Sequence, residues 1–384
     1  MTRVDDGALG KADRSSIPGQ VVLVLQGGGA LGSYQAGVYQ ALHEAGLEPD
    51  WVIGTSIGAI NASLIAGNPV DRRMDALREF WKRMQRPAVW NLRTAFPDFN
   101  ERLSYWTTVT HGIPGFFRPN ALAHAGESYP LGAEEAGYYT TAPLRETLQA
   151  LVDFDLVNGG GLRLTVGAAH VRTGQMRYFD SLHDTVELRH IMASGALPPA
   201  FPAVRIDGEL YWDGGILSNT PTEVVFDDNP RKNSLIFAVH LWNPLGPEPT
   251  TMAEVFNRHK DVQYSSRIAS HIVRQEQTHR LRHVIKELAA RLPEAARNDP
   301  AVRELMGYGC QTRMHVVQLL APQLDRESHT KDIDFSPEGI TLRWEAGYQH
   351  TRSALDRRPW TGEFDPLSGV VLHEHMEATP LAAE

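Results

Sequence analysis

The sequence predicts an α/β protein: a three-layer α/β/α sandwich with a mainly parallel central sheet, plus a helical insertion and a helix-rich C-terminal extension. Two observations predict this class. Apolar, β-branched runs at 21–25, 51–53, 162–169 and 234–240 are typical of buried parallel strands. The first two runs end in glycines and continue into helical patterns. Strands that alternate with helices form a parallel sheet with helices on its faces.

The remaining elements follow from spacing and turn residues. Tyr34, Val38 and Leu42 share one helix face, and Gly46 ends that helix. Asp207-Gly208 between two short apolar arms predicts a hairpin. Further strands are expected at 178–180 and 315–320, and further helices at 72–85, 188–194 and 336–355.

Composition limits the classes of function. The chain has 384 residues, 42% of them hydrophobic, so it can bury a large core. The net charge of −9 argues against nucleic acid as a partner. The single cysteine, Cys310, excludes an intramolecular disulfide and a cysteine-based zinc cluster. The polar N-terminus has no signal-peptide core, and no apolar run approaches ~20 residues. We therefore expect a cytoplasmic, soluble protein that at most touches a membrane surface.

Residues 51–60, WVIGTSIGAI, read as a strand, a sharp turn and a helix. This is the context in which a G-x-S-x-G motif holds a nucleophile. The flanking Gly54 and Gly58 remove side chains that would clash in so tight a turn. The N-terminus of the following helix favours negative charge at Ser56. The motif therefore predicts a nucleophilic Ser56, and the alternative is an ordinary Gly/Ser turn between two core elements.

A glycine-rich loop follows the first strand. Its glycines are Gly27, Gly28, Gly29 and Gly32. Successive backbone N–H groups of such a loop can converge on one oxyanion, as acyl transfer requires. The same spacing fits the dinucleotide fingerprint G-x-G-x-x-G. In that case an acidic residue should end the second strand. Glu48 and Asp50 precede that strand instead, so an oxyanion hole is the favoured interpretation.

The second arm of the predicted hairpin ends in Asp213-Gly214-Gly215. An aspartate at a strand end, followed by two glycines, places a carboxylate in a tight and uncluttered loop. Taken alone, this pattern favours a simple turn aspartate.

Together, the three motifs resemble the patatin-like phospholipase family. The resemblance covers about residues 20–225 and rests on GGGALG (27–32), GTSIG (54–58) and DGG (213–215), in that order. The flanking SYQAGVYQAL and ASGALPPAFP also resemble that family. Residues 331–351 resemble a C-terminal extension found in a bacterial subgroup.

The resemblance implies a Ser-Asp dyad without an obligatory histidine. Ser56 would be the nucleophile and Asp213 the general base, with the N–H groups around Gly28 and Gly29 holding the oxyanion. It implies hydrolysis of lipid acyl esters, as by a phospholipase A or lysophospholipase, without a metal or other cofactor. Many relatives carry Arg or Lys where this chain has Leu31, so the resemblance supports ester hydrolysis more directly than recognition of a phosphate headgroup.

Two other functions stay open at the level of sequence. A carboxylesterase, thioesterase or polyester hydrolase with a Ser-His-Asp triad would use His170 or His240 as its base. A non-catalytic lipid- or acyl-binding protein is the other alternative.

The expected organisation has four parts. Residues 1–19 form a disordered leader. Residues 20–225 form the catalytic domain, with an aromatic- and proline-rich insertion at 71–143 that suits the wall or lid of an apolar pocket. Residues 226–360 complete the sheet and form the helical extension, and 361–384 form a loosely ordered tail.

Apolar spacing over 252–292 predicts one long or kinked amphipathic helix. It carries eight Lys or Arg and four Asp or Glu, a net charge of +4 in an acidic protein. The favoured interpretation of such a face is a solvated surface or an oligomer contact, and peripheral contact with an anionic membrane is the alternative hypothesis. His279 and His283 lie four residues apart without a third ligand, so we expect surface residues rather than metal ligands.

Overall fold

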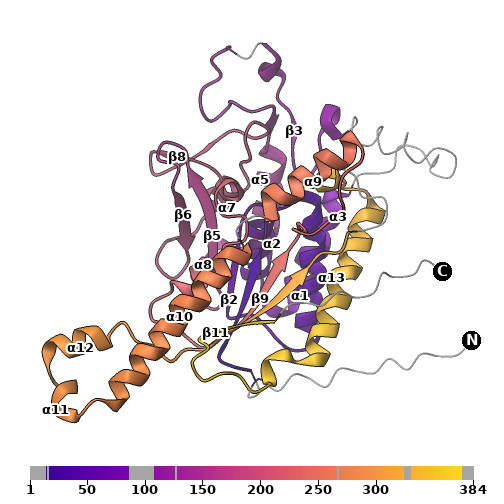
Figure 1. The fold of residues 1–384 in the computed structure, drawn as a ribbon. Helices are drawn as coiled ribbons and strands as arrows, with labels where there is room; N and C mark the ends of the chain where they lie inside the picture. Colours follow the sequence, from indigo (N-terminus) through magenta and orange to yellow (C-terminus); the bar gives the residue numbers. More distant parts are fainter. Residues whose placement is uncertain are drawn as a thin grey trace, which may run out of the picture.

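The computed structural model describes residues 14, 17–85, 108–125, 128–265, 268–323 and 330–373, and each structural statement below concerns these residues. Within them, nine strands form one sheet in the order β11–β10–β9–β1–β2–β5–β8–β7, with β6 paired to β5 (Figure 1). The pairs from β11 to β5 are parallel, and those that involve β6, β7 and β8 are antiparallel. Helices cover both faces, which confirms the predicted fold class.

The elements have the following bounds. The strands of the sheet are β1 Gln20–Leu25, β2 Trp51–Gly54, β5 Arg163–His170, β6 Met176–Asp180, β7 Val204–Ile206, β8 Glu209–Asp213, β9 Ser234–His240, β10 Met314–Leu320 and β11 Val370–His373. A small hairpin pairs β3 Arg118–Pro119 with β4 Tyr139–Thr140. The helices are α1 Ser33–Glu44, α2 Ile57–Ala66, α3 Arg73–Met84, α5 Ala142–Leu151, α6 Phe154–Asn158, α7 Leu188–Ser194, α8 Glu223–Phe226, α9 Met252–Ser265, α10 Ile268–Arg291, α11 Glu294–Arg297, α12 Pro300–Met306 and α13 Pro337–Arg357. Short 3₁₀ helices include η2 Gly29–Gly32, η3 Val70–Arg72, η4 Ala121–Ala125, η5 Gly214–Ile216, η6 Lys331–Ile333 and η7 Pro359–Thr361.

The central strands are apolar on both faces because each face is covered. In β1, Val21, Leu23 and Leu25 belong to the larger apolar cluster, whereas Val22 and Val24 belong to a second cluster on the opposite face. Successive side chains of a strand point to opposite faces, so a near-continuous apolar run is what a doubly covered strand needs.

The C-terminal region is part of this fold. Its helix α13 packs along α1 so closely that backbones touch (Figure 1). A Cβ added at Gly37 would lie 1.8 Å from the carbonyl oxygen of Trp344, and one at Gly347 would lie 2.0 Å from that of Tyr34. Two glycines therefore allow this contact, and α13 is fixed to the first helix of the core.

Two expectations about the ends of the chain need correction. The tail was predicted to be loosely ordered, but Val370–His373 forms β11, which pairs in parallel with β10. A four-residue edge strand carries too little periodicity to be recognised from sequence. Residues 374–384 lie outside the described residues. Of the predicted leader, 1–13 and 15–16 also lie outside them, while Ile17 is buried against the core.

The long helix predicted over 252–292 is divided into α9 and α10. The prediction that His279 and His283 lie at the surface is wrong, because α10 lies against the sheet and buries both. The His279 ring meets Phe226 edge-on at 5.9 Å, and His283 Nε2 lies 2.9 Å from the carbonyl oxygen of Thr312.

Several of the basic groups on these helices already have acidic partners. Lys260 pairs with Asp332 and Arg280 with Asp365. Contact with an anionic membrane stays an untested hypothesis. No helix in the described part of the chain combines the length and the apolar character needed to cross a bilayer.

Candidate active site

Ser56 lies in the turn between β2 and α2, in a backbone conformation that few residues adopt. Its φ is 56° and its ψ −125°, a positive φ that costs a non-glycine residue energy and marks functional turns. The flanking glycines are required because a side chain at either position would collide with neighbouring backbone. A Cβ at Gly54 would lie 2.3 Å from the backbone of Gly58, and one at Gly58 would lie 2.1 Å from the carbonyl oxygen of Leu25. The predicted strand–turn–helix is present.

A second serine, Ser194, fixes the turn that holds Ser56. The N–H of Ser56 donates to Ser194 Oγ at 3.1 Å, and Ser194 Oγ donates to the carbonyl oxygen of Gly167 at 2.6 Å. Ser194 is fully buried. The N–H of Ser56 is therefore committed to the scaffold and not directed at a substrate. The sequence analysis missed this residue, whose one signal is its place in ASGALPPAFP.

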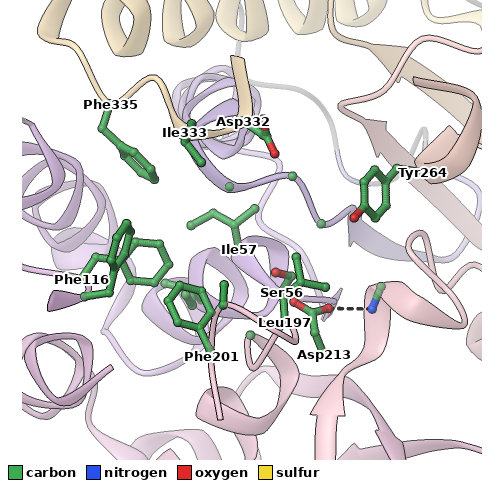
Figure 2. Close-up of a pocket in the computed structure, with 18 of the residues that line it drawn as sticks. Ser56, Ile57, Phe116, Leu197, Phe201, Asp213, Tyr264, Asp332, Ile333 and Phe335 are labelled. Carbon is green, nitrogen blue, oxygen red and sulfur yellow. Dashed lines mark hydrogen bonds between the residues drawn. The ribbon is translucent and has the colours of Figure 1, made fainter. Parts of the chain in front are cut away.

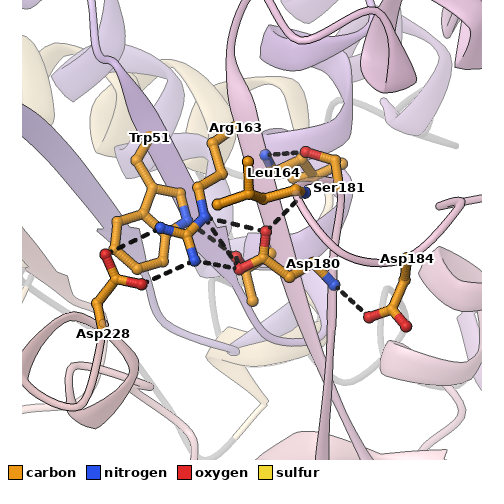
Figure 3. Close-up of polar contacts among 9 residues, drawn as sticks. Trp51, Arg163, Leu164, Asp180, Ser181, Asp184 and Asp228 are labelled. Atoms are coloured by element: carbon orange, nitrogen blue, oxygen red, sulfur yellow. Dashed lines mark hydrogen bonds and ion pairs between the residues drawn. The ribbon is translucent and has the colours of Figure 1, made fainter. Parts of the chain in front are cut away.

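A partly buried ionic cluster holds the strand that leads to the turn at Ser56. The Arg163 guanidinium lies 3.7 Å from the centroid of the Trp51 ring. It donates to Asp180 at 2.7 Å and to Asp228 at 3.0 Å (Figure 3). Trp51 Nε1 donates to Thr165 Oγ1 at 2.8 Å. Since Trp51 begins β2, these contacts fix β2 beside β5 and limit movement of the turn that follows.

Asp213 ends β8 beside Ser56 (Figure 2). Its carboxylate accepts a hydrogen bond from the N–H of Gly215 at 2.7 Å, and the neighbouring Ser56 side chain also favours its charged form. Burial raises the pKa of Asp213 to about 7, although the Ser56 side chain and the Gly215 N–H both oppose the rise. A carboxylate with such a pKa can take a proton at neutral pH.

The two glycines after Asp213 allow the chain to turn in a confined space. A Cβ at Gly214 would lie 2.5 Å from the carbonyl oxygen of Gly167, and one at Gly215 would lie 2.8 Å from Asn219 Oδ1. Any side chain at Gly215 would also crowd Asp213 Oδ1, at 3.0 Å. Their supporting role in the motif therefore has a steric basis.

The glycine loop faces Ser56, but its four glycines are not equivalent. The N–H of Gly27 donates to the carbonyl oxygen of Asn219 at 3.2 Å, and its own carbonyl accepts from Trp242 Nε1 at 2.8 Å. Gly32 caps α1 and packs on Ile57, which a Cβ would approach to 2.5 Å. Both serve the scaffold. Gly28 and Gly29 line the pocket and remain as the candidate oxyanion donors.

A pocket of about 260 Å³ opens over Ser56 and Asp213. Its walls are mainly apolar and aromatic, and they include Phe116, Phe117, Tyr139, Phe201, Trp242, Tyr264 and Phe335. The first three come from the predicted insertion. Trp90, Phe96, Phe99, Tyr105 and Trp106 of that insertion lie outside the described residues. The sequence analysis did not foresee the wall formed by the C-terminal region, which contributes Asp332, Ile333 and Phe335.

Neither candidate histidine reaches this pocket. His170 Nε2 lies 3.3 Å from Glu209, and its ring meets Tyr211 edge-on. His240 is buried at the end of β9, where burial lowers its pKa to about 4. No histidine occurs among the described residues that line the pocket. Among the described residues that line the pocket, Ser56 therefore has the carboxylate of Asp213 nearby and no imidazole.

Two family models match parts of this chain. A family model described as "Patatin-like phospholipase" matches residues 23–226, and one described as "Patatin phospholipase" matches 262–367. Lysophospholipase nte1 of Aspergillus terreus is 59% identical over 259 residues, which cover 61% of this chain and 14% of that protein. A patatin-like phospholipase domain-containing protein of Caenorhabditis elegans is 28% identical over 204 residues, which cover 53% of this chain and 12% of that protein. The chain thus spans only about an eighth of the length of these relatives.

Among solved structures, VipD from Legionella pneumophila aligns with a TM-score of 0.37 and 17% identity, over 88% of this chain and 67% of that one. Human GIVD cytosolic phospholipase A2 in complex with methyl gamma-linolenyl fluorophosphonate aligns with a TM-score of 0.39 and 11% identity. The alignment covers 91% of this chain and 59% of that one.

Proposed function

Since the chain belongs to the patatin-like phospholipase family, we propose that it hydrolyses acyl esters of lipids through a dyad of Ser56 and Asp213. The observation that carries the proposal is that the Ser56 side chain lies beside the buried carboxylate of Asp213 in an apolar pocket (Figure 2). A serine hydroxyl is a weak nucleophile and needs an adjacent base.

The proposed reaction has two halves. Asp213 takes the hydroxyl proton while Ser56 Oγ attacks the ester carbonyl carbon. The resulting oxyanion lies against the N–H groups of Gly28 and Gly29. Collapse of the tetrahedral intermediate expels the alcohol, which receives the proton from Asp213, and leaves an acyl-serine. Water then attacks the acyl-serine while Asp213 takes its proton, and collapse of this second intermediate releases the fatty acid as Ser56 Oγ takes the proton back from Asp213.

The pocket supports an aliphatic acyl group as the part of the substrate that is buried. Its aromatic and aliphatic walls offer apolar contact, at roughly 0.8 kcal/mol per buried methylene. Leu31, which replaces a cationic residue of many relatives, is buried in the core and does not line the pocket. We propose a phospholipase A or lysophospholipase activity; carboxylesters, thioesters and polyesters are the competing substrates.

A purely lipid-binding role is a weaker account of the same site. Passive binding of an acyl chain needs neither a buried carboxylate nor a serine in a strained conformation, both of which cost stability. The discriminating experiment measures fatty-acid release from phospholipid, lysophospholipid, triacylglycerol and thioester substrates. The proposal requires turnover by the native chain that Ser56→Ala abolishes, whereas a binding protein shows none in either form.

Gly28→Ala tests the oxyanion donors. The φ of Gly28 is 170°, an extended conformation open to alanine, but the added Cβ would lie 2.9 Å from Leu241 Cδ1 and push the loop off target. We expect kcat to fall about 100-fold, as for loss of one oxyanion donor, with little change in melting temperature. Gly161→Ala is the control, because its Cβ meets nothing within 4 Å. Equal kcat in both variants would remove Gly28 from the mechanism.

A further inference from the structure

One wall of the catalytic pocket comes from the C-terminal region. Asp332, Ile333 and Phe335 lie in a row across the pocket from Ser56 (Figure 2). We call residues 330–335 the strap. Phe335 meets Phe116 edge-on at 5.9 Å, so the strap continues the aromatic wall that the insertion begins.

Two ion pairs fix the strap to α9. Lys260 pairs with Asp332 at 2.7 Å, and the next residue, Asp261, pairs with Lys331 at 2.7 Å. The side chains of the second pair are 1% and 3% exposed, and those of the first 31% and 22%. The consecutive residues Lys260 and Asp261 of α9 therefore face Asp332 and Lys331 of the strap, and each lysine meets an aspartate.

This arrangement selects a single position for the strap. A shift by one residue would place Lys331 against Lys260 in one direction, or Asp261 against Asp332 in the other. Either contact would bring a buried charge against a like charge. Buried ion pairs add little net stability, and fixing the register of two segments is their best-attested role. The paired charges thus specify where the strap lies on the helix.

The strap also rests directly on the glycine loop. A Cβ at Gly29 would lie 2.2 Å from the carbonyl oxygen of Asp332. Lys331 Nζ lies 5.4 Å from the centroid of the Trp242 ring, whose Nε1 donates to the carbonyl of Gly27. Tyr264 of α9 lines the pocket together with Asp332 and Asp213, and burial followed by these two charges raises its pKa.

We propose that the strap is the acyl-selective wall of the pocket, with Ile333 and Phe335 as specificity-determining residues and the two ion pairs as the positioning device. The inference rests on the proposed ester hydrolysis. The substrate class that follows is an ester with an acyl chain long enough to reach from Ser56 to the strap. The C-terminal region, which lies beyond the match to residues 23–226, thereby becomes part of the substrate site.

A charge-exchange experiment tests this role. The measured quantity is the ratio of kcat/KM for p-nitrophenyl dodecanoate to that for the butyrate. We expect Lys260→Asp and Asp332→Lys each to lower the ratio about ten-fold, as for lost burial of about two methylenes. The double exchange restores the pairing and is expected to bring the ratio back to within about two-fold of the native value.

Two further variants separate selectivity from stability. Ile333→Ala alters the wall without touching the ion pairs and is expected to lower the same ratio. Arg177→Glu breaks the pair with Asp184, at 3.0 Å and away from the pocket lining, and is expected to leave the ratio unchanged. An unchanged ratio in Lys260→Asp or Ile333→Ala overturns the proposal, as does an equal loss for both esters. Fluorophosphonate labelling of the native protein distinguishes the two proposals. If Ser56 is labelled, a negative result concerns only the strap, whereas absence of the label contradicts the proposed hydrolase function.

Discussion

Replacing Asp213 with asparagine is expected to lower kcat by on the order of 10³-fold or more, as for removal of a general base from a serine nucleophile. Asparagine keeps the shape of the side chain and can still accept from the N–H of Gly215, but it cannot take the hydroxyl proton. Steady-state kinetics on a p-nitrophenyl ester measures the loss. His170→Ala and His240→Ala are the controls and should keep most activity, since neither histidine lines the pocket. A histidine variant as inactive as Asp213→Asn would favour a triad.

The same carboxylate sets the pH dependence. With a pKa of about 7, Asp213 is the active base only above that pH. We expect kcat/KM to rise with pH, to level off above about pH 8, and to be roughly 100-fold lower at pH 5. An inflection near pH 4 would mean that Asp213 is not the titrating base.

Asp213 also links stability to pH. Its pKa in the fold lies above the ordinary value of 3.8, so the folded state binds this proton more tightly than the unfolded chain does. The stability gained from that proton is complete below the unfolded pKa and is lost as pH rises through about 7. Asp213→Asn should therefore be more stable than the native chain at pH 9, by up to about 4 kcal/mol, and not at pH 3.

The second large effect is expected at the buried pair of the strap. Lys331→Met leaves the carboxylate of Asp261 buried without its cation, which costs about 3–5 kcal/mol in the free energy of unfolding. Urea denaturation measures the loss. Asp261→Asn added to Lys331→Met removes the orphaned charge and should recover part of it. Lys260→Met is the matched control, because the partly exposed pair with Asp332 contributes about 1 kcal/mol or less. Equal losses for Lys331→Met and Lys260→Met would contradict the assignment of the buried pair.

The parts of this protein that sequence predicts are those encoded locally. The apolar runs of β1, β2, β5 and β9 identify the sheet, and the glycines around Ser56 identify the elbow, because both depend on neighbours in the chain. The pairing of Ser56 with Asp213 was expected only from the resemblance to a family, since 157 positions separate them and no spacing rule joins them.

The missed features arise from contacts between distant segments. The commitment of the Gly27 amide to Asn219, the support of Ser56 by Ser194 and the strap all need the folded chain to bring far residues together. The buried histidines differ, because a signal was present. His279 lies two helical turns after Ile272, which is buried, and so falls on the same face.

The central claim is that Ser56 is the nucleophile, and covalent labelling tests it most directly. The chain is treated with a fluorophosphonate, its intact mass is measured, and the adduct is located by peptide mapping. We predict a single adduct on Ser56 in the native protein, and none in Ser56→Ala, which should keep the native melting temperature and lose esterase activity. An adduct on another serine, or esterase activity that survives in Ser56→Ala, would contradict the account.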